Sequence, residues 1–187
     1  DAKVLLVLGG SRGSHRINTA VHEAISGLVE AAEVVHSCGP ADLTWLSERR
    51  AQLEPTLRDR YHLYGYLYEE LPAAMAAADL VVSRAGASVM GEYPAVGLPS
   101  VLVPYPYAGA HQTLNADVLV GAGAAVKVTD EQLTGSALLS AVGSLLGDRD
   151  RLRQMSQAAR ALDRPRALQT LAEMVTEVGD GVPRLAE

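Results

Sequence analysis

The sequence predicts an α/β fold built on a doubly wound, Rossmann-like parallel sheet, with a helical C-terminal region. Short apolar runs alternate with amphipathic segments, and several of these runs are apolar on both faces, as in a parallel sheet that is covered on both sides. A repeating order of strand and helix implies right-handed crossovers. After Val128 helical spacing dominates, which predicts a helical region at the C-terminal end.

The expected elements alternate through the first two thirds of the chain. The strands are Lys3–Leu8, Glu33–Ser37, Tyr61–Tyr64, Asp79–Ser83, Ser100–Val103 and Ala124–Val128. The helices are Ser14–Glu30, Ala41–Gln52, Glu69–Ala78, Ala87–Ala95 and His111–Gly121. Because the carboxyl ends of parallel strands share one edge of a sheet, the turns from strand to helix are expected to meet there.

Three apolar stripes with helical spacing follow, and the last of them consists of Leu168, Leu171, Val175 and Val178. The acids expected to cap these helices, or to lie in their first turns, are Asp130, Asp148 and Asp163. The triplet 148–150, Asp-Arg-Asp, is therefore interpreted as a helix start rather than as a metal-binding motif. The predicted domain covers residues 1–178, and residues 179–187 are predicted to form a flexible tail.

Composition excludes several classes of protein. The 187 residues, 48% of them hydrophobic, can bury the core of one domain or of half a larger protein. Scattered basic residues and a net charge of −6 argue against nucleic-acid binding, and the single Cys38 excludes a disulfide framework. No apolar run approaches the ~20 residues that span a bilayer, so we expect a cytoplasmic protein. Because a strand follows Asp1 so closely, we also expect upstream sequence to be missing.

The first candidate site is the glycine cluster 9–13, Gly-Gly-Ser-Arg-Gly, which follows the first expected strand. Glycine permits positive φ and close approach of a ligand to the backbone, and the Ser11 hydroxyl can donate to a phosphate. The spacing matches neither the dinucleotide fingerprint nor a Walker loop. A tight turn without a ligand is the alternative interpretation.

The second candidate site follows the fourth expected strand, where residues 83–88 read Ser-Arg-Ala-Gly-Ala-Ser. Small residues here suit a helix start whose N–H groups face an anion. Ser88 and Glu92 are four residues apart, so they share one helix face and are separated by about 6 Å along its axis. Glu92 can accept from ribose hydroxyls, while Arg84 can either pair with a diphosphate or lock its loop to a carboxylate.

The third candidate site follows the fifth expected strand. A stiff loop over residues 104–110 leads to His111 and Gln112, with Asn115 one turn further. Uncharged imidazole and amide groups suit neutral sugar hydroxyls, because they bury no net charge. The other histidines, which are His15, His22, His36 and His62, are interpreted as structural or exposed.

Together these motifs resemble a known family. The combination of GGSRG, YGYL at 64–67, SRAGAS with Glu92, and HQ followed by NA at 115–116 is similar to the C-terminal, donor-binding half of the lipid II-forming N-acetylglucosaminyltransferases of bacterial peptidoglycan synthesis. These are glycosyltransferases of family 28 with the GT-B fold. The likeness runs from Lys3 to about Val178.

The resemblance implies a site for UDP-N-acetylglucosamine. Its diphosphate would lie at the turn around Ser11, and its phosphate and sugar at the backbone of residues 86–88. Tyr66 and Leu67 would hold the uracil, Glu92 the ribose, and the polar groups of the third site the sugar. The implied donor-binding residues are Gly10, Ser11, Arg12, Gly13, Tyr66, Leu67, Arg84, Gly86, Ala87, Ser88, Glu92, His111, Gln112 and Asn115. No metal or other cofactor is expected, and no catalytic residue is assigned in this chain.

Two departures from the family pattern limit what the resemblance implies. Val89 stands where these enzymes often have a hydroxyl residue, and the acceptor domain is missing. The fragment is therefore expected to bind the donor but to transfer little, while the full-length enzyme would work at the inner face of the cell membrane on a lipid-linked acceptor. The alternatives are a non-catalytic nucleotide-sugar-binding subunit, a UDP-sugar epimerase, and a glycosyltransferase with another donor or acceptor.

Overall fold

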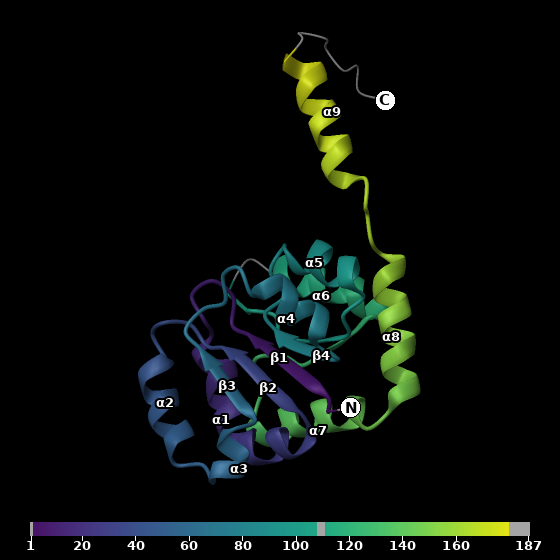
Figure 1. Ribbon diagram of the computed structural model, residues 1–187. Coiled ribbons are helices and arrows are strands. Elements are labelled where there is room, and N and C mark those ends of the chain that lie inside the picture. Colours follow the sequence, from purple (N-terminus) through teal and green to yellow (C-terminus); the bar gives the residue numbers. More distant parts are fainter. Residues whose placement is uncertain (1, 108–110, 180–187) are drawn as a thin grey trace.

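The computed structural model describes residues 2–107 and 111–179 (Figure 1). The last residues of the stiff loop that leads to His111, and residues 180–187 of the predicted tail, lie outside the described residues. None of the helices in the described part is both long and apolar enough to cross a membrane.

A six-stranded parallel sheet forms the centre of the fold, as the sequence predicts. Its strands are β1 (Val4–Leu8), β2 (Glu33–Ser37), β3 (Tyr61–Tyr64), β4 (Leu80–Ser83), β5 (Ser100–Leu102) and β6 (Ala125–Lys127). They lie in the order β3-β2-β1-β4-β5-β6. The chain therefore adds β2 and β3 on one side of β1 and then adds β4, β5 and β6 on its other side, so the strand order reverses between β1 and β4. The pairing of Leu8 with Ser83 brings the ends of these two strands, and the turns that follow them, side by side.

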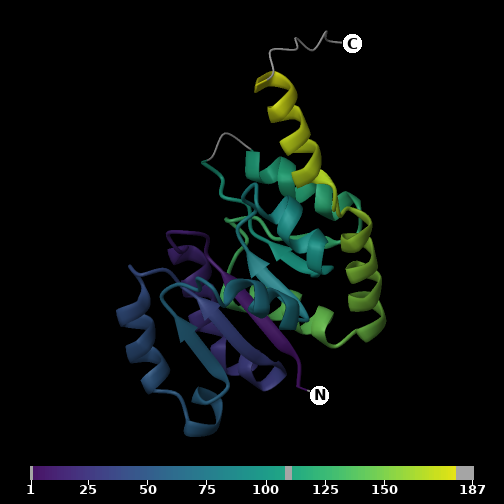
Figure 2. The same cartoon turned by 45° about the horizontal axis from the view of Figure 1, so that its top comes forward.

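Helices cover both faces of the sheet, as Figures 1 and 2 show. They are α1 (His15–Ala31), α2 (Leu43–Ala51), α3 (Pro55–Arg58), α4 (Leu71–Ala77), α5 (Val89–Val96), α6 (His111–Gly121), α7 (Gly135–Leu146), α8 (Arg149–Ala161) and α9 (Ala167–Gly179). Along β1, Leu5 and Val7 join a core with α1 and α7, whereas Leu6 joins a second core with α4, α5 and α6. Strands that are buried on both faces explain the uninterrupted apolar runs in the sequence.

Two of the predicted helix caps need correction, and one short helix was not predicted. Thr134, not Asp130, caps α7, because its side chain accepts from Ala137 N. Asp148 does cap α8, accepting from Arg151 N at 2.9 Å, whereas Asp163 lies before α9 and accepts from Arg164 N. The single turn α3 was not predicted, because four residues are too few for a helical period to show.

The third apolar stripe does not enter either core. Its residues lie on α9, which stands apart from the α/β body in Figure 1. Leu168 is 80% exposed and Val178 is 67% exposed. Helical spacing therefore predicted the amphipathic helix, but within this chain nothing covers its apolar face in the part that the structure describes.

A chain of buried polar side chains joins β3, β2 and α1. The Tyr61 hydroxyl is 2.8 Å from His36 Nδ1, and His36 Nε2 is 2.9 Å from Asn18 Oδ1. Asn18 Nδ2 donates to Cys38 O and to Asp42, so its oxygen is the acceptor for His36. His36 Nε2 therefore carries the proton, and the Tyr61 hydroxyl donates to Nδ1.

Burial makes His36 a neutral residue in the folded state. Removal from water lowers the pKa of its imidazole to about 3, although the charge of Asp42 acts in the opposite direction. The unfolded chain binds a proton at His36 below about pH 6.5, whereas the folded chain does not. This residue therefore makes the free energy of unfolding fall as the pH falls from about 6.5 towards 3, and it has no such effect above that range.

We predict that His36→Gln flattens this dependence. Below about pH 6 the slope contributed by one such histidine approaches ~1.4 kcal/mol per pH unit. Urea unfolding of the chain and the variant at several values between about pH 4 and pH 7 measures it. The matched variant His22→Gln, at a partly exposed position on α1, should keep the slope of the unchanged chain. Equal slopes for the chain and His36→Gln would contradict the prediction.

Candidate functional site

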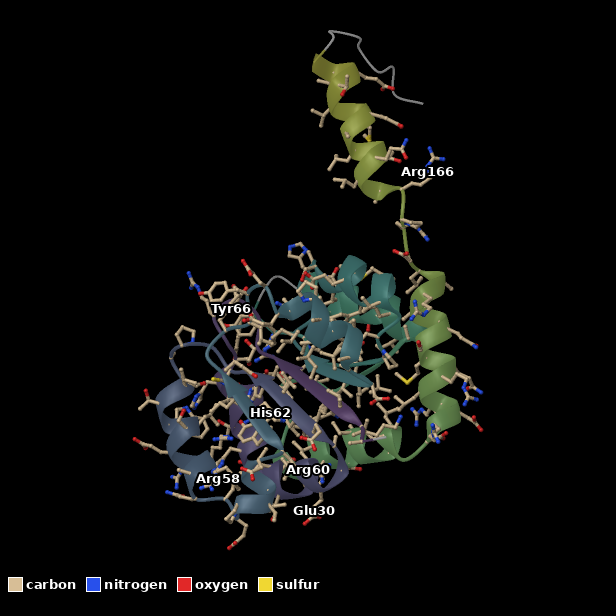
Figure 3. All side chains as sticks on the ribbon, in the orientation of Figure 1. Glu30, Arg58, Arg60, His62, Tyr66 and Arg166 are labelled. Atoms are coloured by element: carbon tan, nitrogen blue, oxygen red, sulfur yellow. The ribbon has the colours of Figure 1, made fainter. Side chains whose placement is uncertain are left out.

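A large cavity lies at the carboxyl edge of the sheet, where β1 and β4 adjoin. It has a volume of about 820 Å³ and is lined by the turns that follow β1, β3, β4, β5 and β6. Figure 3 shows Tyr66 beyond the carboxyl end of β3, while Arg60 and Glu30 lie towards the opposite end of the sheet. A crevice where the strand order reverses is the usual place for a ligand in a doubly wound sheet.

Most of the residues predicted for a donor site border this one cavity. Those that line it are Gly10, Ser11, Arg12, Gly13, Tyr66, Leu67, Arg84, Gly86, Ser88, Glu92 and Gln112. Ala87, His111 and Asn115 are not among the lining residues. The three candidate sites of the sequence thus come together in space, together with the turn that carries the YGYL motif.

The turn after β1 presents backbone N–H groups to the cavity. Gly13 has a φ of 79°, and a Cβ there would collide with the carbonyl oxygen of Cys38. Glycine is therefore required to bring this turn against β2. The N–H groups of residues 10–12 have no acceptor among the described residues, while Gly13 N donates to Gly10 O at 3.0 Å. Such a row of free N–H groups is typical of an anion site.

The turn after β4 carries a second row of backbone N–H groups. The N–H groups of residues 86–88 have no acceptor within the described ranges. The helix α5 begins at Val89, two residues after the predicted start, and its first N–H groups close tight turns onto residues 86–88, for example Val89 N onto Gly86 O at 3.3 Å. The free donors are thus in the turn itself. Its start is fixed by Tyr93, whose hydroxyl donates to Ser83 Oγ at 2.7 Å, and burial raises the pKa of Tyr93.

Ser88 and Glu92 share the same helix end. Ser88 is the N-cap of α5 and makes no capping hydrogen bond with its side chain, so its hydroxyl is available to a ligand. Glu92 lies in the first turn of α5, and both residues line the cavity. One free hydroxyl and one carboxylate therefore stand next to a row of free N–H groups.

Arg84 holds three turns together. Its Nε donates to the α1 N-cap, Ser14 Oγ, at 3.0 Å, and its Nη1 donates to Val103 O at 3.2 Å. The same Nη1 forms an ion pair with Asp130 at 2.5 Å, and the guanidinium lies 5.3 Å from the ring centre of Tyr105. Of the two roles that the sequence left open for Arg84, these contacts support the loop lock.

The amides of α6 also position neighbouring turns. Gln112 Oε1 accepts from Ala85 N at 3.2 Å and from Tyr105 N at 2.9 Å. Asn115 Nδ2 donates to Ala85 O at 3.0 Å. One atom of each amide is thus committed to the fold, and Gln112 Nε2 and Asn115 Oδ1 have no partner among the described residues.

Sequence reasoning missed several residues of the cavity. They include Ser14, His15, Arg16, Leu71, Tyr105 and Asp130. Tyr105 belongs to the stiff loop and could have been included with it. His15 and Arg16 are the first residues of the helix that follows the glycine turn, so their place in the chain was the available signal. Asp130 could not be found, because nothing local distinguishes an ion-pair partner of Arg84 from a helix cap.

The charges of the cavity are of both signs. Its carboxylates, among the described residues, are Glu92 and Asp130, and Asp130 is already paired with Arg84. Arg12 and Arg16 add positive charge beside the glycine turn. Nowhere in the described ranges do three or more His, Cys, Asp or Glu side chains gather as they would around a metal ion.

Curated relatives share most of this chain. A UDP-N-acetylglucosamine--N-acetylmuramyl-(pentapeptide) pyrophosphoryl-undecaprenol N-acetylglucosamine transferase from Roseiflexus sp. (strain RS-1) is 45% identical over 92% of this chain and 43% of its own length. A protein of the same name from Exiguobacterium sp. (strain ATCC BAA-1283 / AT1b) is 43% identical, over 95% of this chain and 48% of its own. The chain thus spans about half the length of the relatives it matches.

A solved structure and a family model agree with these relatives. The crystal structure of MurG from Acinetobacter baumannii superposes with a TM-score of 0.79 at 27% identity, covering 95% of this chain and half of that one. The model of the glycosyltransferase family 28 C-terminal domain matches residues 4–171, which contain the sheet and every turn around the cavity. The chain therefore belongs to glycosyltransferase family 28, as a C-terminal domain of that family.

Proposed function

We propose that the chain is the donor-binding half of an inverting glycosyltransferase that transfers N-acetylglucosamine from its UDP conjugate to a lipid-linked muramoyl-pentapeptide. The observation that carries the proposal is a pair of N–H rows, at residues 10–12 and 86–88, in a chain of this family. These N–H groups have no acceptor among the described residues, and all of the residues that carry them except Ala87 line one cavity. Two such rows suit a diphosphate, which has several oxygens to satisfy. The names of the relatives support the sugar and the acceptor.

In this proposal each part of the donor meets a different turn. The uracil lies against Leu67, which is buried, and against Tyr66, whose ring packs on Tyr68 at 4.6 Å between ring centres. Glu92 accepts from the ribose hydroxyls, and the N–H rows bind the diphosphate. The amide nitrogen of Gln112 donates to the sugar, because its oxygen is already occupied by two backbone donors.

The transfer step needs a group from outside this chain. The acceptor hydroxyl oxygen forms a bond to the anomeric carbon while the bond from that carbon to the diphosphate breaks, which inverts the configuration. The hydroxyl proton passes to a base in the missing acceptor half, and UDP leaves with the negative charge. Backbone N–H groups stabilise that charge without a metal. Since the acceptor carries an undecaprenyl lipid in the named relatives, we place the full-length enzyme at the cytoplasmic face of the membrane.

Another function for this fold fits less well. An epimerase would require catalytic acids in the cavity, and of its two described carboxylates Asp130 is held by Arg84. A nucleotide-sugar-binding subunit that acts with a separate acceptor chain remains the second candidate, because the chain spans half the length of its relatives. The two cases differ in whether one reading frame encodes both halves.

We predict that the chain binds UDP and UDP-N-acetylglucosamine but transfers no sugar on its own. Titration calorimetry measures the binding, and ADP, which has the same diphosphate but a larger base, serves as the control. We expect heat from the two uridine ligands and weaker or no heat from ADP. Equal binding of ADP and UDP would remove the uracil pocket from the proposal, and no heat from any of the three would overturn it.

We predict that Glu92→Ala weakens UDP binding by about 1.5–3 kcal/mol, the scale of a hydrogen bond to a charged group. The matched control is Glu69→Ala, because Glu69 is an exposed acid that does not line the cavity. Calorimetry on both variants gives the comparison. If Glu92→Ala binds UDP as tightly as Glu69→Ala does, Glu92 is not a ribose ligand.

We predict that Arg84 supports donor binding by holding the turns rather than by touching phosphate. Arg84→Gln and Asp130→Asn should each lower the free energy of unfolding by about 1–3 kcal/mol and weaken UDP binding. The double variant should be little less stable, and bind UDP little more weakly, than the more strongly affected single variant, because the two residues act as a pair. A direct phosphate contact predicts the opposite for Asp130→Asn, because that change would release the guanidinium. Unchanged or tighter UDP binding by Asp130→Asn would therefore contradict the loop-lock role.

A further inference from the structure

His15 is a cavity residue that the sequence did not assign to the site. It is the first residue of α1 and lines the cavity directly after the glycine turn. Its side chain is 74% exposed, yet its ring is held in place. Nδ1 lies 3.0 and 3.1 Å from the two oxygens of Asp42, and the ring meets that of Trp45 edge-on at 5.9 Å between ring centres.

Asp42 is a fixed anionic partner for this ring. It accepts from Trp45 Nε1 at 2.8 Å and from Asn18 Nδ2 at 2.7 Å as well as from His15. Although partial burial acts in the opposite direction, these hydrogen bonds lower the pKa of the Asp42 carboxyl. Asp42 therefore stays ionised near neutral pH, and an ionised carboxylate can only accept.

The position of the proton on His15 follows from this contact. Because Asp42 only accepts, Nδ1 must carry hydrogen, and a neutral ring then has a lone pair on Nε2. Nε2 has no partner in the described part of the chain. A neutral His15 would thus present an acceptor to an anion in the cavity, and a protonated His15 would present a donor.

The surroundings of His15 contain charges of both signs. Arg12, in the glycine turn before His15, and Arg16, the next residue of α1, line the same cavity. Arg16 Nε donates to Asp130 O at 3.2 Å. Arg84 and Asp130, on the turns after β4 and β6, neutralise each other. Glu92 on α5 lines the cavity, and the ring centre of His22 lies 5.6 Å from that of Trp45. Among the described charged residues, Asp42 is the one that forms a hydrogen bond with the His15 ring.

We infer that His15, anchored by Asp42, is a phosphate-binding residue of the donor site that acts only in its protonated form, so that donor binding takes up a proton. The inference rests on the proposed function, because it requires a diphosphate at the turn that His15 follows. A bound diphosphate adds negative charge next to a ring that already faces Asp42, and this favours the imidazolium. Nε2–H then donates to a phosphate oxygen in a charge-assisted hydrogen bond.

UDP-N-acetylglucosamine is the right probe, because its diphosphate is esterified at both ends and exchanges no proton near neutral pH, unlike the terminal phosphate of UDP. Calorimetric titration of the chain between about pH 6 and pH 8, in buffers of low and high ionisation enthalpy, should show proton uptake and an affinity that falls roughly tenfold as the pH rises. In His15→Gln the affinity should become nearly independent of pH, at the weaker value.

His22→Gln is the matched control, since His22 lies on the same helix against the same indole but does not line the cavity. It should keep the full pH dependence. Proton uptake of equal size in the unchanged chain and in His15→Gln would overturn the inference, as would equal affinities across the pH range. Those outcomes leave donor binding intact, whereas failure of the unchanged chain to bind the donor at any pH would overturn the proposed function itself.

Discussion

The parallel pairing of β1 with β4 is the constraint on which the site depends. Its register places Leu8 opposite Ser83, so that the glycine turn and the turn of residues 84–88 leave the sheet side by side. Each turn supplies N–H groups that neither the sheet nor a helix uses. Unpaired backbone donors are costly inside a protein and harmless in a cavity, which is where both rows lie. A slip in this pairing would separate the two rows of N–H groups.

Side chains around the cavity divide into those that hold the turns and those left for a ligand. Arg84, Gln112 and Asn115 each use one or more polar atoms to fix a neighbouring turn. Ser88 and Glu92 have no such duty in the described part of the chain. His15 combines both features, because Nδ1 is anchored by Asp42 and Nε2 has no partner among the described residues. The turn that leads to Ser88 is thus held at Ala85 by the side chains of Gln112 and Asn115.

In the part of the chain that the structure describes, the apolar residues of the last helix, α9, join neither core. The apolar residues of α9 are exposed, although the spacing that predicts an amphipathic helix is as regular there as in α7 and α8. Helical periodicity is a local property of the chain, whereas burial depends on which surface a helix meets. The chain spans about half the length of the relatives it matches.

The sequence alone determined the strands, the helices around the sheet other than α3, and the turns that form the site, because each depends on local signals. Period and apolar runs mark the elements, and glycine and small residues mark turns such as those at Gly13 and Gly86. Only the tertiary structure decided that Asp130 pairs with Arg84 rather than capping a helix, and that His15 meets Asp42. Those partners are 46 and 27 residues apart in the chain. No local pattern encodes such pairs, since they form only when the sheet brings their turns together.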